Sequence, residues 1–188
     1  KNYQNMKKRN ILALVAATFA LCMGSCQKPD DKENYPQMEM AEGSAIVVDA
    51  YQEHDPAGAY PLSFSITRVG DKFVVEGGVN QANQAAIELG VPSSTMCTST
   101  AAIANAGEFS SLKAMSEIAY PAFGDATETP IVVENGYVVK VWGSQGLDQY
   151  QKPGVSDTKP LYIRLYVAEL TEAGTYTVRY QYPFVPEE

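Results

Sequence analysis

Apolar and polar residues alternate along segment 161–168. Aliphatic residues occupy its odd-numbered positions, whereas Tyr162, Arg164 and Tyr166 occupy the first three even-numbered ones. Successive side chains of a strand point to opposite faces, so this period of two predicts a strand with one buried face. Because the register leaves no freedom once that face is buried, Tyr162, Arg164 and Tyr166 are expected on the outer face of a sheet.

The same period continues in two neighbouring segments. In 176–182, Arg179 and Gln181 alternate with tyrosines and a valine, and in 137–142, Trp142 has the parity opposite to the expected core positions. If these segments pair with 161–168, their outward side chains join the same row as its tyrosines and arginine. We expect this outward row to be exposed and able to bind a ligand.

Further elements are expected earlier in the chain. A β-branched run at 45–51 and an alternating hairpin pattern at 62–78 predict strands. Small and β-branched residues at 95–104 predict another strand. Short helices are expected in 80–90 and 110–118, because each has a capping residue at its start and a Gly or Pro at its end.

The chain is therefore expected to be mainly β, as a single antiparallel β-sandwich or partly open barrel with one or two short helices. Asn135-Gly136 lies between apolar runs within 130–143 and predicts a hairpin turn. A second turn at 172–174 separates two long strands. The sequence around Tyr176 resembles the tyrosine corner of immunoglobulin-like sandwiches, so that architecture is one alternative.

The first 25 residues have the layout of a secretory signal. A basic stretch at 7–9 precedes an apolar run at 11–22, and small residues follow. The apolar run has 12 residues, whereas a helix that spans a bilayer needs roughly 20. We therefore expect 1–25 to be an export signal, with Met6 as the natural start.

Gly24-Ser25-Cys26 resembles the lipobox of bacterial lipoproteins, although Met23 stands where Leu is usual. The resemblance implies cleavage before Cys26 and acylation of its thiol, which would hold the mature chain to a lipid bilayer. The alternative is an ordinary secretory signal followed by an incidental cysteine. The polar stretch at 27–33 resembles the acidic export tag of Bacteroidota-type surface lipoproteins. The alternative is a solvated tether that carries no sorting signal.

These features predict three parts. They are a lipoprotein signal peptide at 1–25, a lipidated cysteine with a flexible tether at 26–43, and a single β-rich domain at 44–188. The expected location is the outer membrane, where the lipid-anchored domain faces either the cell surface or the periplasm.

The C-terminal pattern adds a second resemblance. "NGYVVKV", "YIRLYVAEL" and "VRYQYPF" resemble, over roughly 103–184, a family of small Bacteroidota-type surface lipoproteins with no assigned activity. The matching positions are Gly136, Tyr137, Val138, Tyr162, Arg164, Tyr166, Val167, Tyr180, Gln181, Tyr182, Pro183 and Phe184. Many members carry His-Gly where this chain has Asn135-Gly136, so any role of that histidine is absent, which weakens the case for an enzyme.

Charge and cysteine content exclude several classes of function. The formal net charge is −8, and after removal of 1–25 it is −12, with 10 basic and 22 acidic residues. An acidic surface repels phosphates, so no nucleic-acid partner is expected. With Cys22 removed and Cys26 acylated, Cys97 has no disulfide partner, and it is expected to be a small buried apolar residue.

The residue types and motifs in the sequence also exclude several common catalytic sites. His54 is the sole histidine, so an H-E-x-x-H zinc site is impossible, and no nucleophile elbow or phosphate-binding loop occurs. Asp49, Glu53, His54 and Asp55 lie close together, but they lack the spacing of a calcium loop, and a solvated loop is the better interpretation. We expect no cofactor and no metal.

The expected function is a non-catalytic, membrane-anchored lipoprotein that binds a glycan or a protein partner. The candidate binding residues are Tyr162, Arg164, Tyr166, Trp142 and Arg179. Aromatic faces supply rigid apolar area, and Arg donates to polar groups. One alternative is a subunit of an envelope or fimbrial assembly that pairs through an edge strand. A carboxylate-dependent hydrolase is a further alternative, and it would need two acids in one cleft.

Overall fold

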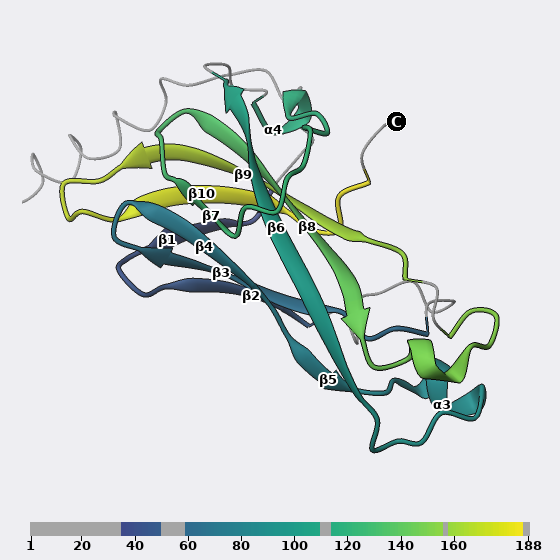
Figure 1. Ribbon diagram of the computed structural model, residues 1–188. Helices are drawn as coiled ribbons and strands as arrows, with labels where there is room; N and C mark the ends of the chain where they lie inside the picture. Colours follow the sequence, from purple (N-terminus) through teal and green to yellow (C-terminus); the bar gives the residue numbers. More distant parts are fainter. Residues whose placement is uncertain (1–34, 50–58, 110–113, 156–157, 186–188) are drawn as a thin grey trace, which may run out of the picture. The chain divides into compact units, whose positions relative to one another are not determined.

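The computed structural model describes residues 35–49, 59–109, 114–155 and 158–185. They form two antiparallel sheets, one of them curled into a half-barrel (Figure 1). The six-stranded sheet has the order β1-β10-β9-β8-β6-β5, and the four-stranded sheet has the order β2-β3-β4-β7. The described chain is mainly β, as the alternating pattern predicts. Its strand order differs from the A-B-E-D and C-F-G sheets of an immunoglobulin domain.

The elements have the following bounds. The strands of the six-stranded sheet are β1 (Gln37–Met40), β10 (Tyr176–Gln181), β9 (Leu161–Leu170), β8 (Asn135–Gln145), β6 (Met96–Glu108) and β5 (Val79–Gln81). The strands of the four-stranded sheet are β2 (Ala45–Asp49), β3 (Ser63–Val69), β4 (Lys72–Gly77) and β7 (Glu128–Pro130). The helices are α3 (Gln84–Glu88), α4 (Ala114–Glu117) and a 3-10 turn, η1 (Asp148–Tyr150).

The hairpin and the first helix follow from local sequence and are confirmed. β3 and β4 pair antiparallel, with Val69 opposite Lys72 across the turn. The side chain of Asn83 caps α3, because its oxygen accepts the backbone N–H of Ala86 at 2.8 Å. The second helix is present as α4, and the serines expected to cap it lie outside the described residues.

The hairpin expected at Asn135-Gly136 is wrong. Both residues begin β8 and pair with β6. The chain turns earlier, at Glu134, whose φ of 66° lies in the left-handed region. A Cβ at Gly136 would lie 2.6 Å from Cγ1 of Ile118. The glycine is therefore needed for close packing against the segment that follows α4, and not for a tight turn.

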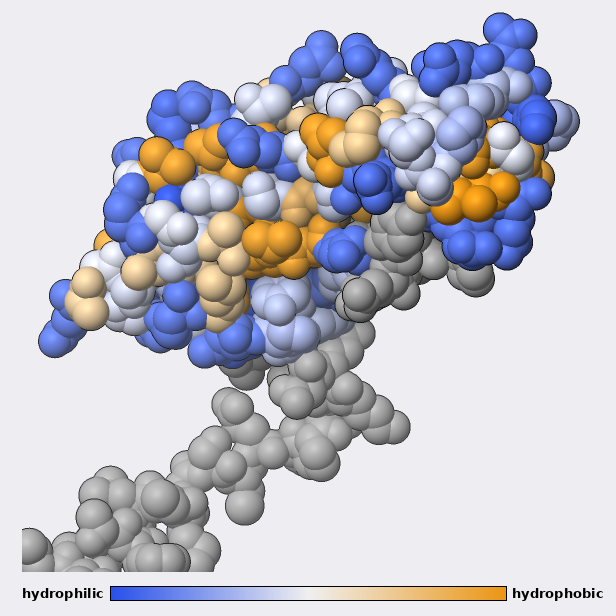
Figure 2. All heavy atoms as spheres, turned by 90° about the horizontal axis from the view of Figure 1, so that it is seen from below, coloured by the Kyte–Doolittle hydropathy of each residue, from blue (hydrophilic) through white to orange (hydrophobic). Residues whose placement is uncertain are grey.

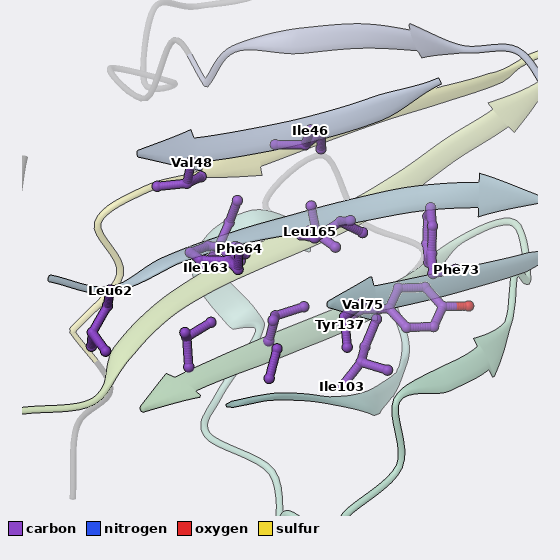
Figure 3. Packing of buried hydrophobic residues seen from close by; sticks show 14 of the residues in the cluster. Ile46, Val48, Leu62, Phe64, Phe73, Val75, Ile103, Tyr137, Ile163 and Leu165 are labelled. Carbon is purple, nitrogen blue, oxygen red and sulfur yellow. The ribbon is translucent and has the colours of Figure 1, made fainter. Parts of the chain in front are cut away.

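The core lies between the two sheets (Figure 3). The inward faces predicted for the last three strands are confirmed, since the buried residues there are Tyr137, Val139, Val141, Ile163, Leu165, Val167, Tyr176 and Val178. The ring of Phe73, from β4, packs edge-on against that of Tyr137 with 5.2 Å between centroids. Burial of each large apolar side chain contributes about 1.5–3 kcal/mol, so this layer provides most of the stability.

The folded domain begins at Tyr35, before the predicted boundary at residue 44. Strand β1 lies in the stretch expected to be tether, and it pairs with β10, Met38 facing Val178. The side chain of Met40 is fully buried in the core. Sequence reasoning missed β1 because it has no β-branched residue, and its partner strand lies at the other end of the chain.

One side of the sandwich is closed by the chain itself. β4 continues through Gly77-Gly78 into β5, which belongs to the other sheet. There Ser99 donates its N–H to Gly78 O, and Gly78 donates its N–H to Ser63 O, both at 2.8 Å. A Cβ on Gly77 would collide with the carbonyl oxygen of Ser99. The other side carries β1 and β2, which are joined by the turn at 41–44.

Candidate functional site

The outer face of the six-stranded sheet carries a second hydrophobic cluster. It packs beneath α4 and the segment that follows β10 (Figure 1). Its buried members, called the outer cluster below, are Met115, Ile118, Val138, Tyr166 and Phe184. Two of them come from β8 and β9, and three from the covering segments. Part of the face predicted to be open is thus covered by the chain itself.

Arg164 lies within the outer cluster and is 8% exposed. Its Nε donates to the side-chain oxygen of Gln181 at 2.6 Å, and its terminal nitrogens donate to Ile118 O at 3.3 Å and to the hydroxyl of Tyr35 at 3.0 Å. The guanidinium carbon lies 4.7 Å from the ring centroid of Phe184. Arg164 therefore ties the N-terminal segment, the end of α4 and the C-terminal segment to β9.

The prediction that the outward row is exposed is wrong for Arg164 and Tyr166, since each is 8% exposed. The predicted direction and neighbours are confirmed, because Gln181 lies opposite Arg164 and Arg179 lies opposite Tyr166. Arg179 itself is half-buried. The period of two assigns a face, but it does not say whether another segment covers that face. A ligand at the surface would not reach the guanidinium of Arg164.

Tyr162, the first member of the row, lies in a partly exposed aromatic group. Its ring centroid is 5.4 Å from that of Tyr120 and 6.3 Å from that of Phe123. The Tyr120 and Phe123 centroids are 5.2 Å apart, and the hydroxyls of Tyr120 and Tyr162 are 3.3 Å apart. Tyr120 is 42% exposed. These three residues, called the aromatic cluster below, are all at least partly exposed to solvent.

Trp142 and Lys140 extend this surface along β8. Lys140 faces Tyr162 across the β8–β9 pair, and its Nζ lies 5.4 Å from the ring centroid of Trp142. Both side chains are partly exposed. We call the aromatic cluster together with Trp142 and Lys140 the aromatic surface. It combines flat apolar rings with one flexible donor, which suits binding of a polar ligand that has apolar faces.

Sequence reasoning missed Tyr120, Phe123, Lys140 and Tyr35. The stretch "AYPAFG" at 119–124 has two aromatics in a loop, and aromatic residues outside a periodic pattern were the available signal. Lys140 has the same parity as Trp142, so the alternation that placed the tryptophan also placed the lysine. Nothing local points to Tyr35, because its contact with Arg164 joins residues 129 positions apart.

Other ionisable groups serve the fold. Cys97 is buried in the core, as predicted, and burial raises its thiol pKa to about 11, so the thiol stays protonated at neutral pH. Burial also raises the pKa of Tyr137, whose hydroxyl donates to Pro130 O at 3.0 Å and accepts from Val132 N–H at 2.8 Å. Burial likewise raises the pKa of Tyr60, which bonds the ends of β6 and β8 together.

Several predictions fall outside the described residues. They are the signal at 1–25, acylation of Cys26, the first half of the tether (26–34), and the loop with His54. In the part of the chain that the structure describes, no group of acids, His and Cys is arranged to hold a metal ion. No helix there is long and apolar enough to cross a membrane.

Comparison with known proteins finds no matching family model, no similar curated protein and no similar solved structure. The resemblance of the C-terminal pattern to small Bacteroidota-type lipoproteins therefore stays a prediction. The aromatic surface and the resemblance of Gly24-Ser25-Cys26 to a lipobox are the two features that point to a function.

Proposed function

We propose that this protein is a non-catalytic lipoprotein of the outer membrane, held by acyl chains on Cys26, and that its domain binds a glycan through the aromatic surface. The observation that carries the proposal is the partly exposed group of Tyr120, Phe123 and Tyr162 beside Trp142 and Lys140. Fully buried aromatics are explained by packing alone, whereas partly exposed rings gathered from a loop and two strands leave ring area that a ligand can contact.

The size of the surface favours a glycan over a protein partner. A stable protein interface takes about 20–30 residues on each side. The aromatic surface has four rings and one ammonium group, which matches one or two sugar rings. The C–H faces of a sugar pack on aromatic rings, and its hydroxyls accept from Lys140 and from the tyrosine hydroxyls.

A glycan array with the mature chain tests the binding proposal. We expect Trp142→Ala and Tyr120→Ala to weaken binding at least tenfold, since each removes a ring that contacts the ligand. Tyr150→Ala is the matched control, because Tyr150 is a half-buried tyrosine outside the aromatic surface that bonds to Thr95. No binding by the parent chain, or equal binding by all variants, would contradict the proposal.

The lipid anchor is tested separately. A metabolically incorporated fatty-acid analogue should label the parent chain, and Cys26→Ser should abolish the label. Protease added to intact cells then reports which side of the outer membrane the domain faces. An unlabelled, freely soluble mature chain would disprove the anchor and leave the glycan test unaffected.

A further inference from the structure

Three basic side chains lie in a diagonal line across β8, β9 and β10, on the outer face of the six-stranded sheet. Lys140 faces Tyr162 across the β8–β9 pair, and Arg164 is the next outward residue of β9. Gln181 faces Arg164, and Arg179 is the next outward residue of β10. About 7–8 Å separates diagonal neighbours in an antiparallel pair. Lys140, Arg164 and Arg179 are called the three cations below.

Among the described residues, no acid forms an ion pair with any of the three cations. Arg164 donates to an amide oxygen, a backbone carbonyl and a hydroxyl, all of which are uncharged. The ammonium group of Lys140 lies over the ring of Trp142, which carries no net charge. Ion pairing does occur on the other sheet, where Lys72 Nζ lies 2.6 Å from Glu128. The positive charge of the three cations is therefore not cancelled by direct contact with an acid.

The outward positions around Lys140 also lack acids. Those of β8 and β9 are Gly136, Val138, Lys140, Trp142, Tyr162, Arg164, Tyr166 and Ala168. The covering segment carries exposed Glu117 and Asp125, and neither pairs with Lys140. After removal of 1–25 the chain has 22 acids and 10 basic residues, so an acid-free stretch stands out. Like charges held close together repel each other, and a bound anion would offset that repulsion.

Lys140 is the cation that lies beside partly exposed rings. Its Nζ is 5.4 Å from the ring centroid of Trp142, and its strand position faces Tyr162. An anionic group bound at Nζ thus places the sugar that carries it next to both rings. On the face seen in Figure 2, by contrast, hydrophobic residues lie in separate groups among hydrophilic ones. The aromatic surface therefore combines the two features that recognise an acidic sugar, a ring face and a free positive charge.

We propose that the glycan bound at the aromatic surface is acidic, and that the ammonium group of Lys140 binds its carboxylate or sulfate group. This inference rests on the proposed function and names the class of ligand. Arg164 is buried, so it adds positive potential without touching the ligand. Lysine is a compact point charge, whereas arginine matches the plane of a carboxylate. The site therefore selects negative charge on the sugar, and not the shape of the charged group.

The acidic character of the whole chain does not prevent this binding. The formal charge of −12 after removal of 1–25 repels anions at long range. At physiological ionic strength that repulsion is screened beyond about 8 Å, which is similar to the spacing of the three cations. The nearest charges then decide whether an anion is bound. We expect the preference for an acidic sugar to fall as salt is raised to about 1 M, where screening acts over about 3 Å.

Titration of the mature chain with matched pairs of sugars tests the proposal. Trigalacturonate and its methyl ester have the same rings and differ in charge, and a sulfated galactan oligosaccharide is compared with its desulfated form. We expect the parent to bind at least one charged sugar roughly fivefold or more tightly than its neutral partner. Lys140→Gln should bring that ratio close to one. Binding of the neutral sugar should change less than about twofold, because the amide keeps a hydrogen-bond donor.

Lys72→Gln is the matched control, because it changes the net charge equally but lies on the four-stranded sheet. It should keep the preference, and thermal unfolding confirms that both variants fold. An equal loss in the two variants would overturn the assignment to Lys140. Equal binding of charged and neutral sugars by the parent would overturn this inference and leave the proposed function standing. If the parent binds none of the four sugars, this inference fails, and the glycan array decides the proposed function separately.

Discussion

The outer faces of the two sheets differ, although the same alternating pattern produces both. On the six-stranded sheet, β9 turns Tyr162, Arg164 and Tyr166 outward, and α4 and the C-terminal segment cover the last two. On the four-stranded sheet, β3 turns Ser63, Ser65 and Thr67 outward, and Ser65 at the centre of that row is only half-buried. The face that the chain covers thus carries large outward side chains, whereas the outward row of β3 carries small ones.

The physical reason is the area that each face offers. Tyr and Arg carry long apolar stems and rings, so a short segment laid over them buries enough surface to offset the entropy of ordering it. Serine and threonine offer little apolar area, and a covering segment would gain almost nothing. The first face therefore gains a second cluster and the aromatic surface, whereas the outward row of β3 stays half-buried.

The largest expected change in the free energy of unfolding is at the covered outer face of the six-stranded sheet. Arg164→Ala leaves Ile118 O, the Gln181 side chain and the Tyr35 hydroxyl without their donor, and it opens space in the outer cluster. We expect a loss of about 2–4 kcal/mol in the free energy of unfolding, measured with urea. Arg164→Lys should rescue little, because one ammonium group cannot reach three acceptors in the guanidinium geometry. Unchanged stability would mean that the cover contributes nothing.

An intermediate change in the free energy of unfolding is expected from Tyr166 at alkaline pH. Burial raises the pKa of Tyr166 in the folded chain above its ordinary value of 10.0. The unfolded chain then loses this proton first, so the free energy of unfolding falls as the pH rises past 10 and through the folded pKa. Tyr166→Phe has no such proton and should lose less stability between pH 8 and pH 11 in urea titrations. Parallel losses in both proteins would show that Tyr166 is not covered.

The smallest expected change in the free energy of unfolding is at the outer face of the four-stranded sheet. Ser65→Ala should change the free energy of unfolding by no more than about 0.5 kcal/mol, because Ser65 points outward from the four-stranded sheet and is a small, half-buried side chain. The same urea series gives the value beside that of Arg164→Ala. A loss close to that of the arginine variant would remove the distinction between the two faces.

Much of the fold could be predicted from local pattern. The β3–β4 hairpin, the cap of α3 at Asn83 and the faces of β8, β9 and β10 all follow from short-range rules. The hairpin turn predicted at Asn135-Gly136 does not form. Gly136 instead lies in β8, where the absence of a side chain lets Ile118 pack closely against it. β7 was not predicted either, since it has three residues and depends on pairing with β4.

The candidate site could be predicted only in part. Trp142 and Tyr162 lie partly exposed on the outer face of the six-stranded sheet, as predicted, whereas Arg164 and Tyr166 are buried there. The sequence pattern names the residues on a face, and the loops that reach that face come from distant positions. Tyr120 and Phe123 lie 42 and 39 positions from Tyr162 in the chain, so no local rule joins them.

What the sequence alone determined is the direction of each strand side chain, because a period of two is a property of the backbone itself. It also carries the resemblance of Gly24-Ser25-Cys26 to a lipobox, a short pattern that is read without any knowledge of the fold. Only the tertiary structure decided which of the outward residues are covered by other segments. Those outcomes depend on long-range packing, where a segment orders only if the area it buries exceeds the entropy it loses.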